Sequence, residues 1–148
     1  MFNMRTLITV LALCLPVTLS AVPAVPILPN ISKAELTCLT ENIYYEARNQ
    51  PLSGQVAVGI VTLNRVKSNL FQSSICKVVY APNQFSWTKS KKLVILEKEA
   101  WKTAKYAAYL SLSSNTFRAL YYHSKDIRPY WAKHKVALTT IGDHKFYM

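Results

Sequence analysis

The stretch from Glu41 to Arg65 limits the possible folds more than any other part of this 148-residue chain. Its first part has the apolar spacing of a helix, and Pro51 disfavours helical geometry at the residue before it. After that break, the sequence VAVGIVTLNRV (Val56–Val66) would be apolar around most of the circumference of a helix. Such a helix is typically buried. We therefore expect two consecutive helices separated by a short break, with the second helix inside the core.

The first of these helices has a recognisable start, buried face and end. Ser32 and Glu35 have the Ser-x-x-Glu spacing of a capping box, which predicts that Ser32 caps the helix and that the Glu35 side chain bonds back to the cap. The apolar residues that recur at helical spacing are Leu36, Leu39, Ile43 and Ala47. We expect the helix to end near Arg48, shortly before the proline.

Glu46 lies at the edge of that apolar face, close to the expected helix end. Burial against the second helix would raise the pKa of its carboxyl group, so that the group keeps a proton near neutral pH. A carboxylic acid of this kind is suited to protonating a leaving oxygen, as in glycoside cleavage. Glu41 lies about 140° away around the helix, so the two are not expected to act as a pair. The alternative is a structural Glu46 paired with Arg48 or Arg65.

The first 24 residues have the composition of a secretory signal peptide. Their apolar run, Thr6–Leu19, is shorter than the roughly 20 residues that a membrane span needs. We therefore expect the signal peptide to be cleaved and the mature protein to have no stable membrane span. The alternative is an uncleaved signal-anchor. Proline at every third position then predicts an extended linker over residues 25–30. The length of the remainder, residues 31–148, is that of a single domain.

Export would place the cysteines in an oxidising compartment. Loss of the signal removes Cys14, whose use as a lipoprotein site is disfavoured by the bulky Leu13 before it, and leaves Cys38 and Cys76 as an even pair. A disulfide between these two would hold the helices around Glu46 together. The alternative is two buried free thiols. Nothing in the sequence marks either cysteine as an activated nucleophile.

The second half of the chain predicts a loop, one more long helix and a small sheet. The loop, residues 68–90, is rich in aromatic and amide side chains, and the helix is expected from about Leu93 to Leu112 with a Lys-rich outer face. Three short segments have the composition of strands, with a turn at Gly142–Asp143: they are Ala119–His123, Val136–Thr140 and Lys145–Tyr147. The expected fold class is α+β, mainly helical, with a short C-terminal β element.

Several separated motifs, in the same order, resemble one known family. ENIYYEAR, GQVAV and LNRV lie between Glu41 and Val66, and CKVVY and FSW lie between Cys76 and Trp87. ALYYH, PYWA and IGDHKFY follow near the C-terminus. Together they resemble the SleB/CwlJ-type cell-wall hydrolases, which cut the glycan strands of bacterial peptidoglycan. The resemblance covers nearly everything from Leu36 to the end of the chain.

This resemblance implies a small domain similar to the lysozymes and lytic transglycosylases. It implies that Glu46, the Glu of the family's Glu-Ala-Arg motif, is the catalytic acid. It also implies cleavage of the β-1,4 bond between N-acetylmuramic acid and N-acetylglucosamine. The residues expected to bind the glycan are Gln84, Phe85, Trp87, Tyr121, Tyr122 and His123.

The charge of the chain fits such a substrate. The chain has 18 Lys and Arg residues against 7 acidic residues. Proteins with this charge commonly meet nucleic acid, an anionic membrane surface or an acidic polymer. Export argues against nucleic acid, whereas peptidoglycan carries lactyl and stem-peptide carboxylates. The alternative is that the charge serves only solubility and non-specific adhesion.

A zinc site is the alternative to carboxylate chemistry, because zinc amidases also cut peptidoglycan. Its ligands would come from His123, His134, Asp143 and His144. The spacings of these residues match no compact ligand motif such as H-E-x-x-H. We therefore expect no metal and no other cofactor.

A single well-placed carboxylate favours lytic transglycosylation over hydrolysis. Hydrolysis usually needs two carboxylates on either side of the bond, and only Asp126 and Asp143 remain as candidates for the second. Muramidase-type hydrolysis with one of these, or a non-catalytic basic glycan-binding module, are the alternatives. We expect an exported monomer in the periplasm or cell envelope, or a phage-encoded enzyme that acts on the host wall.

Overall fold

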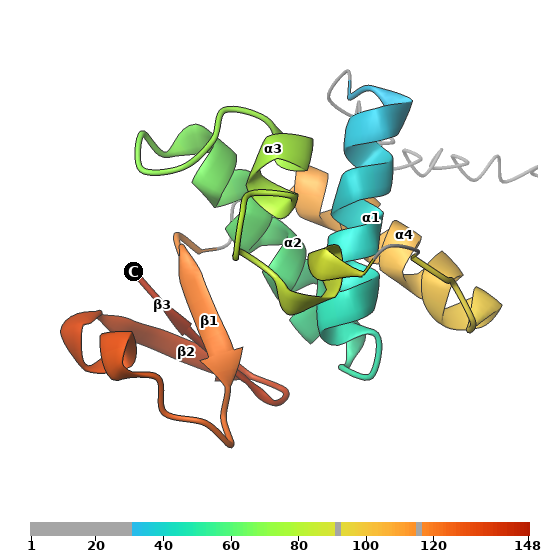
Figure 1. The fold of residues 1–148 in the computed structure, drawn as a ribbon. Helices are drawn as coiled ribbons and strands as arrows, with labels where there is room; N and C mark the ends of the chain where they lie inside the picture. Colours follow the sequence, from blue (N-terminus) through green and yellow to red (C-terminus); the bar gives the residue numbers. More distant parts are fainter. Residues whose placement is uncertain (1–30, 91–92, 115–116) are drawn as a thin grey trace, which may run out of the picture.

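The computed structural model describes residues 31–90, 93–114 and 117–148, so the predicted signal peptide and linker lie outside the described residues. Within these ranges a group of helices precedes a small C-terminal sheet (Figure 1). The helices are α1 (Lys33–Ala47), α2 (Leu52–Lys67), α3 (Ile75–Val79) and α4 (Lys98–Leu112), with the 3-10 helices η1 (Ser86–Lys89) and η2 (Tyr130–His134). The strands are β1 (Tyr121–Ser124), β2 (Ala137–Ile141) and β3 (His144–Tyr147).

Helix α2 forms the centre of the core, as its sequence predicts. Its residues are buried over most of the circumference, and α1, α3 and α4 all pack against it. Gly59 allows α4 to come close, because a Cβ atom at this position would lie 2.6 Å from the hydroxyl oxygen of Ser111. The predicted break is also present, with Pro51 immediately before the first residue of α2.

Helix α1 starts and ends where the sequence predicts, but one half of its predicted capping box is wrong. Ser32 accepts a hydrogen bond from the backbone N–H of Glu35 at 3.2 Å. The Glu35 carboxylate does not return to this cap. It accepts the N–H groups of Ile75 at 2.6 Å and Cys76 at 3.3 Å, at the start of α3. A carboxylate is well placed there, because the first N–H groups of a helix have no partner within the helix.

Helix α4 begins at Lys98, and the prediction of a start near Leu93 is wrong. Residues 93–97 form no helix, and two tyrosines of α1 bond to their backbone. The hydroxyl of Tyr45 donates to the carbonyl of Val94 at 3.1 Å, and the N–H of Glu97 donates to the hydroxyl of Tyr44 at 3.3 Å. These contacts with α1 satisfy backbone groups that a longer helix would have paired internally.

The sheet is antiparallel, in the order β1-β3-β2. Each strand lies within two residues of its predicted segment, and the predicted turn between β2 and β3 contains Gly142 at φ +58°. Tyr122 pairs with Phe146, and both pack against the helical core. Side chains alternate along a strand, so Tyr121 and His123 lie on the other face.

Among the described helices, none is both long and apolar enough to cross a membrane.

A disulfide joins Cys38 of α1 to Cys76 of α3, whose Cα atoms lie 5.2 Å apart. This spacing is within the range that a disulfide requires. The bond lies next to the contact of Glu35 with the start of α3. Helix α3 is therefore attached to α1 both covalently and through hydrogen bonds.

Replacing both Cys38 and Cys76 by Ser is expected to lower the free energy of unfolding by about 3 kcal/mol, because the bridge restricts the unfolded chain. Chemical denaturation of the oxidised protein measures this change. Non-reducing peptide mapping should show the two cysteines linked, and two thiols that can be alkylated in the folded protein would rule the bridge out.

Candidate active site

Glu46 lies in the last turn of α1, where the helix meets the sheet. Its carboxyl oxygen Oε2 accepts a hydrogen bond from the hydroxyl of Tyr122 at 3.1 Å. Tyr122 belongs to β1, 76 residues later in the chain. The contact therefore brings the two parts of the domain together at the residue that the sequence singles out.

Burial raises the pKa of the Glu46 carboxyl group above its usual value. Three smaller effects oppose burial because each favours the carboxylate: the hydrogen bond from Tyr122, the nearby indole N–H of Trp87, and the positive charge of Arg65. The Trp87 N–H is buried and has no hydrogen-bond partner of ordinary geometry among the described residues. Glu46 is therefore an acid that holds its proton to higher pH than an exposed Glu, with groups beside it that stabilise the carboxylate.

Tyr122 is suited to donate this hydrogen bond at any physiological pH. Burial, and then the charge of Glu46, raise the pKa of its phenol well above the ordinary value. The phenol therefore keeps its proton, and the ring of Tyr122 is held by edge contacts with His144 at 5.3 Å and by Phe146 at 5.8 Å.

Arg65, in α2, connects the helical core to the start of β1. Its Nε donates to the carbonyl of Leu120 at 2.7 Å, two residues before Tyr122. Its guanidinium group lies over the rings of Phe71 and Phe85, with centroid distances of 5.1 and 5.9 Å. Burial lowers the pKa of Arg65, but an arginine remains charged at neutral pH. Arg65 therefore supplies a fixed positive charge and positions the strand that carries Tyr122.

Neither arginine that could have neutralised Glu46 forms an ion pair with it. Arg48 pairs instead with Glu97, at 2.9 Å, and Arg65 bonds to the main chain. The interpretation of Glu46 as one half of a structural ion pair therefore has no support in the contacts.

The other acidic residues are engaged elsewhere. All seven acidic residues of the chain lie in the described ranges. Two acids bond to uncharged groups of the helices: Glu35 accepts backbone N–H groups, and Glu41 accepts the hydroxyl of Tyr80. Glu97 pairs with Arg48, and Glu99 pairs with Lys102. Asp126 accepts the hydroxyl of Ser124, and Asp143 bonds to Lys125 and Gln50. None of these carboxylates hydrogen-bonds to Tyr122 or Glu46, so Glu46 is the one acid in its immediate network.

Of the three glycan-binding residues predicted from η1 and the loop before it, Trp87 lies against the Glu46 site. Its ring stacks on Tyr45 at 4.7 Å and on Phe85 at 6.1 Å. Phe85 itself is buried, so its main contribution is to the core below Arg65. Gln84 is partly exposed, and its side chain does not hydrogen-bond to Glu46 or Tyr122.

Of the three predicted from β1, only Tyr122 points toward Glu46. Tyr121 lies on the other face, near Phe71 and Trp131 at 5.9 and 5.8 Å. His123 is buried on that same face, where its Nε2 bonds to the hydroxyl of Tyr147 at 2.8 Å. The structure therefore does not bring Tyr121 and His123 to the Glu46 side, because neighbouring residues of a strand point to opposite faces.

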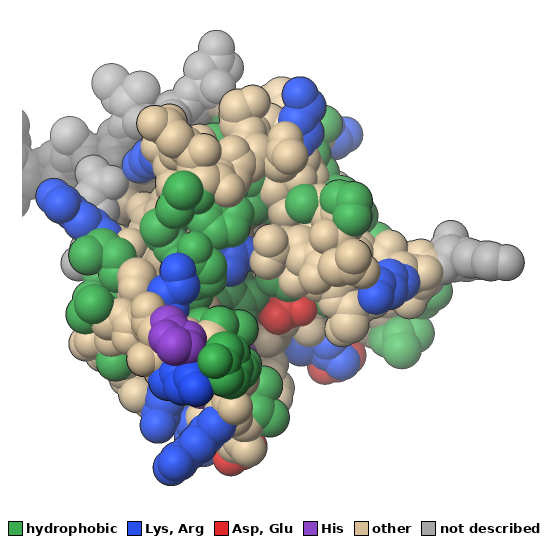
Figure 2. Space-filling view, turned by 60° about the vertical axis from the view of Figure 1, so that its left-hand side comes forward, with side chains coloured by type: hydrophobic (Ala, Val, Ile, Leu, Met, Phe, Trp, Pro, Cys, Tyr) green, Lys and Arg blue, Asp and Glu red, His purple; other side chains and the backbone are tan. Residues whose placement is uncertain are grey.

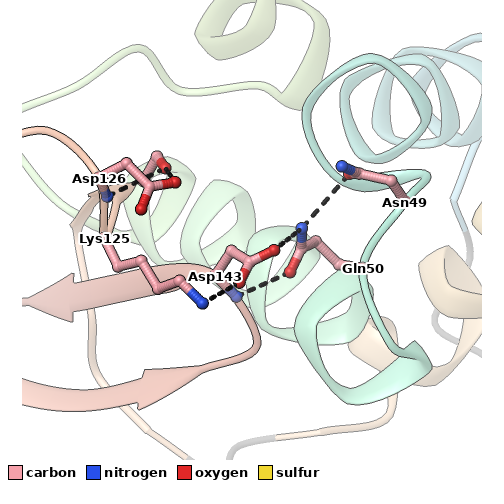
Figure 3. Close-up of polar contacts among 6 residues, drawn as sticks. Asn49, Gln50, Lys125, Asp126 and Asp143 are labelled. Atoms are coloured by element: carbon pink, nitrogen blue, oxygen red, sulfur yellow. Dashed lines mark hydrogen bonds and ion pairs between the residues drawn. The ribbon is translucent and has the colours of Figure 1, made fainter.

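The sequence did not point to Gln50, which connects the break after α1 to the β2–β3 turn (Figure 3). Its amide nitrogen donates to Asp143 at 3.2 Å, and its amide oxygen accepts the backbone N–H of Asp143 at 2.8 Å. Lys125 completes the group with an ion pair to Asp143 at 2.5 Å, which lowers the pKa of that carboxyl group. Gly142 suits this turn because its φ of +58° favours glycine, and a Cβ atom there would also overlap the Gln50 amide oxygen.

The surface beside the sheet is hollowed, and hydrophobic side chains lie along the hollow with an acidic side chain at its edge (Figure 2). A pocket of about 690 Å³ lies elsewhere on the described part of the chain. Apolar residues of α2, α4 and β2 line it, including Val56, Leu110 and Ile141. Glu46 and Trp87 are not among its lining residues, so size alone does not identify the reactive site.

The described residues contain no group of three or more His, Cys, Asp or Glu side chains that could hold a metal ion. The four residues of the zinc alternative are therefore not gathered into one ligand set. His123 bonds to Tyr147, and Asp143 bonds to Lys125.

Comparison with known proteins identifies the class of this domain. Residues 49–147 match the family described as Cell Wall Hydrolase. The chain belongs to the cell wall hydrolase family. The predicted family is thus confirmed, and the prediction of a cell-wall enzyme agrees with it. The matched range starts three residues after Glu46, so the role of Glu46 stays a proposal.

Similar proteins include the spore cortex-lytic enzymes of two Bacillus species. The chain is 30% identical over 116 residues to that of Bacillus subtilis, covering 78% of this chain and 38% of the relative. It is 31% identical over 118 residues to that of Bacillus cereus, covering 78% and 44%. The chain therefore spans less than half the length of these relatives.

The structure is also similar to two solved catalytic domains. The catalytic domain of the Bacillus cereus SleB protein has a TM-score of 0.67 and 31% identity, covering 82% of this chain and 95% of that one. The catalytic domain of the germination-specific lytic transglycosylase SleB from Bacillus anthracis has a TM-score of 0.65 and 29% identity, covering 81% and 99%. The predicted fold class, mainly helical with a small sheet, is confirmed.

The substitution Tyr122→Phe is expected to raise the pKa of Glu46 further, because it removes a hydrogen bond that favours the carboxylate. Carbon-13 NMR titration of the Glu46 carboxyl group measures the change directly and needs no activity assay. Tyr121→Phe, on the opposite face of β1, is the matched control and should leave that pKa unchanged. An unchanged or lower pKa in Tyr122→Phe would show that the hydrogen bond does not form in solution.

Proposed function

We propose that this protein cleaves the β-1,4 bond between N-acetylmuramic acid and N-acetylglucosamine in peptidoglycan, as a lytic transglycosylase with Glu46 as acid and then base. One observation carries the proposal: Glu46 is a partly buried carboxyl group that makes no ion pair, whereas the other six acids are bonded elsewhere. The family of the chain, and its similarity to a lytic transglycosylase domain from Bacillus anthracis, support the same conclusion.

In the first step, protonated Glu46 gives its proton to the glycosidic oxygen as the bond from that oxygen to C1 of the muramic acid breaks. The raised pKa keeps the proton on Glu46 to a higher pH than on an exposed Glu. The carboxylate that remains is stabilised by the Tyr122 hydroxyl and by the positive charge of Arg65. Burial thus favours the acid before the step, and these two groups favour the carboxylate after it.

In the second step, the Glu46 carboxylate accepts the proton of the muramic C6 hydroxyl as that oxygen bonds to C1. Glu46 regains its proton, no water is consumed, and the released sugar carries a 1,6-anhydro ring. One carboxyl group is enough for both steps, in agreement with the surroundings of Glu46. Trp87 lies beside the carboxyl group and is partly exposed, so a bound sugar can contact the part of its ring that Tyr45 and Phe85 leave uncovered.

The alternatives have less support. Muramidase-type hydrolysis needs a second carboxylate, and the best remaining candidate, Asp143, is bonded to Lys125 and Gln50. A non-catalytic glycan-binding module would gain nothing from a desolvated acid, because burial of an ionisable group without an ion pair costs stability. We further propose that the protein acts as an exported monomer in the periplasm or cell envelope, or as a phage-encoded enzyme on the host wall.

The substitution Glu46→Gln is expected to lower the rate of peptidoglycan cleavage by at least about 100-fold, because it keeps the shape and removes the proton. Release of soluble fragments from purified peptidoglycan measures the rate. Glu41→Gln, which loses a carboxylate bonded to Tyr80, is the control and should keep most of the activity. Equal losses in the two variants would contradict the assignment.

Thermal unfolding separates this loss from misfolding. The folded-state pKa of Glu46 lies above that of an unfolded Glu, so the stability that the protonated form provides is lost as the pH rises through the folded-state pKa. The amide of Gln cannot ionise, so Glu46→Gln should unfold at the same temperature as the wild type or higher at neutral pH. A marked decrease would mean that the activity loss reflects damage to the fold.

Mass spectrometry of the released muropeptides tests the course of the reaction. The expected products end in 1,6-anhydro-N-acetylmuramic acid, which is lighter than the hydrolysis product by one water. The reaction in isotopically labelled water should leave the new ends unlabelled. Reducing ends that carry the label would contradict the one-carboxylate mechanism, and Asp143 would then become the next residue to substitute.

A further inference from the structure

A second pocket lies on the face of the sheet opposite Tyr122, between β1, β3 and the segment that contains η2. Its volume is about 450 Å³. The residues of interest in its lining are His123, Arg128, Tyr130, Lys133, Lys145 and Tyr147. Three of these six side chains are permanently positive at neutral pH, so the pocket is a concentrated positive surface.

The positive charges of this pocket are not neutralised within the described part of the chain. Arg128, Lys133 and Lys145 make no ion pair with any described carboxylate. The two acids nearest in sequence are occupied, since Asp126 bonds to Ser124, and Asp143 pairs with Lys125 outside the pocket. Like charges that share one concave surface repel one another, and an anion bound between them would relieve the repulsion.

Aromatic contacts give the pocket a defined shape. The ammonium group of Lys133 lies 3.8 Å from the ring centroid of Tyr130, a cation–π contact that orients it. His123 is buried, with Nδ1 2.7 Å from the carbonyl of Ser124 and Nε2 2.8 Å from the hydroxyl of Tyr147. A carbonyl only accepts, so Nδ1 donates to it, while Nε2 bonds to the Tyr147 hydroxyl. Both ring nitrogens of His123 are thus engaged within the protein, and the donors left for a ligand are those of Arg128, Lys133 and Lys145.

We propose that this pocket binds the carboxylates of peptidoglycan stem peptides, while the glycan strand lies at Glu46. The proposal rests on the function proposed above. β1 is an edge strand of the sheet, and its consecutive residues Tyr122 and His123 face the two sites. A substrate that passes the edge of β1 can therefore contact both.

An anionic membrane surface is the competing ligand, because Ile127, Val136 and Leu138 are exposed in the same part of the chain. Two features favour the peptide. The cations line a hollow, which suits a small carboxylate better than a flat lipid surface. The membership of the chain in the cell wall hydrolase family also supplies a polymer that carries such carboxylates.

The test compares intact peptidoglycan with glycan strands whose stem peptides have been removed. The double substitution Arg128→Ala and Lys133→Ala is expected to raise KM for intact peptidoglycan by about tenfold, the worth of a hydrogen bond to a charged group. kcat should stay unchanged, and so should both constants on peptide-free strands. Lys102→Ala with Lys105→Ala, on the exposed side of α4, removes the same charge and is the control.

Three results would overturn the proposal. An equal rise of KM on both substrates would show that the pocket does not recognise the peptide. The same rise of KM in the α4 control would show that the effect depends on the overall charge of the protein and not on the pocket. Loss of binding to phosphatidylglycerol vesicles by the double variant, with intact peptidoglycan unaffected, would assign the pocket to the membrane.

Direct binding keeps this proposal separate from the proposed function. Calorimetry with a purified stem peptide should show binding to the wild-type protein, weaker binding to the double variant, and weaker binding of a peptide whose carboxylates are amidated. If peptidoglycan is not cleaved but the peptide binds in this way, the pocket is supported and the proposed function fails. If cleavage occurs and the peptide does not bind, only the pocket proposal fails.

Discussion

The hydrogen bond from Tyr122 to Glu46 is the contact on which the rest of the site depends. It exists only because the sheet rests against the end of α1, and two further connections hold the sheet there. Arg65 bonds to the backbone just before β1, and Gln50 bonds to the β2–β3 turn through Asp143. All three come from α1, α2 or the break between them, so the helical core determines where the strands place their side chains.

Local signals in the sequence were sufficient for most of the fold. Continuous apolar character predicted the burial of α2, and Pro51 predicted the break before it. The signals failed where a distant partner changed the local preference. Glu35 bonds to α3 and not to its own cap, and the tyrosines of α1 hold residues 93–97 out of a helix. No pattern within a short window reports a partner that is 40 or more residues away.

The features of the site also divide into those that local sequence predicts and those that depend on distant partners. The raised pKa of Glu46 follows from its place on an apolar helix edge, which the sequence displays. The contact with Tyr122 and the role of Gln50 depend on tertiary packing and could not be inferred from the sequence alone. Of the predicted glycan-binding residues Tyr121, Tyr122 and His123, only Tyr122 faces Glu46 in the structure. A predicted strand already places alternate residues on opposite faces, and the two neighbours of Tyr122 lie away from Glu46.

Arg65 has a consequence for the charge of the site during the proposed reaction. The guanidinium group stays positive throughout, whereas Glu46 is neutral before proton transfer and negative after it. The summed charge of Arg65 and Glu46 therefore changes from +1 to zero at the moment when the sugar ring becomes positive. Proton transfer thus creates a carboxylate on the enzyme and a positive sugar ring, and Arg65 offsets the new negative charge on the enzyme side. Because the bond from Arg65 to the carbonyl of Leu120 holds the guanidinium group in place beforehand, this compensation needs no movement of the protein during the step.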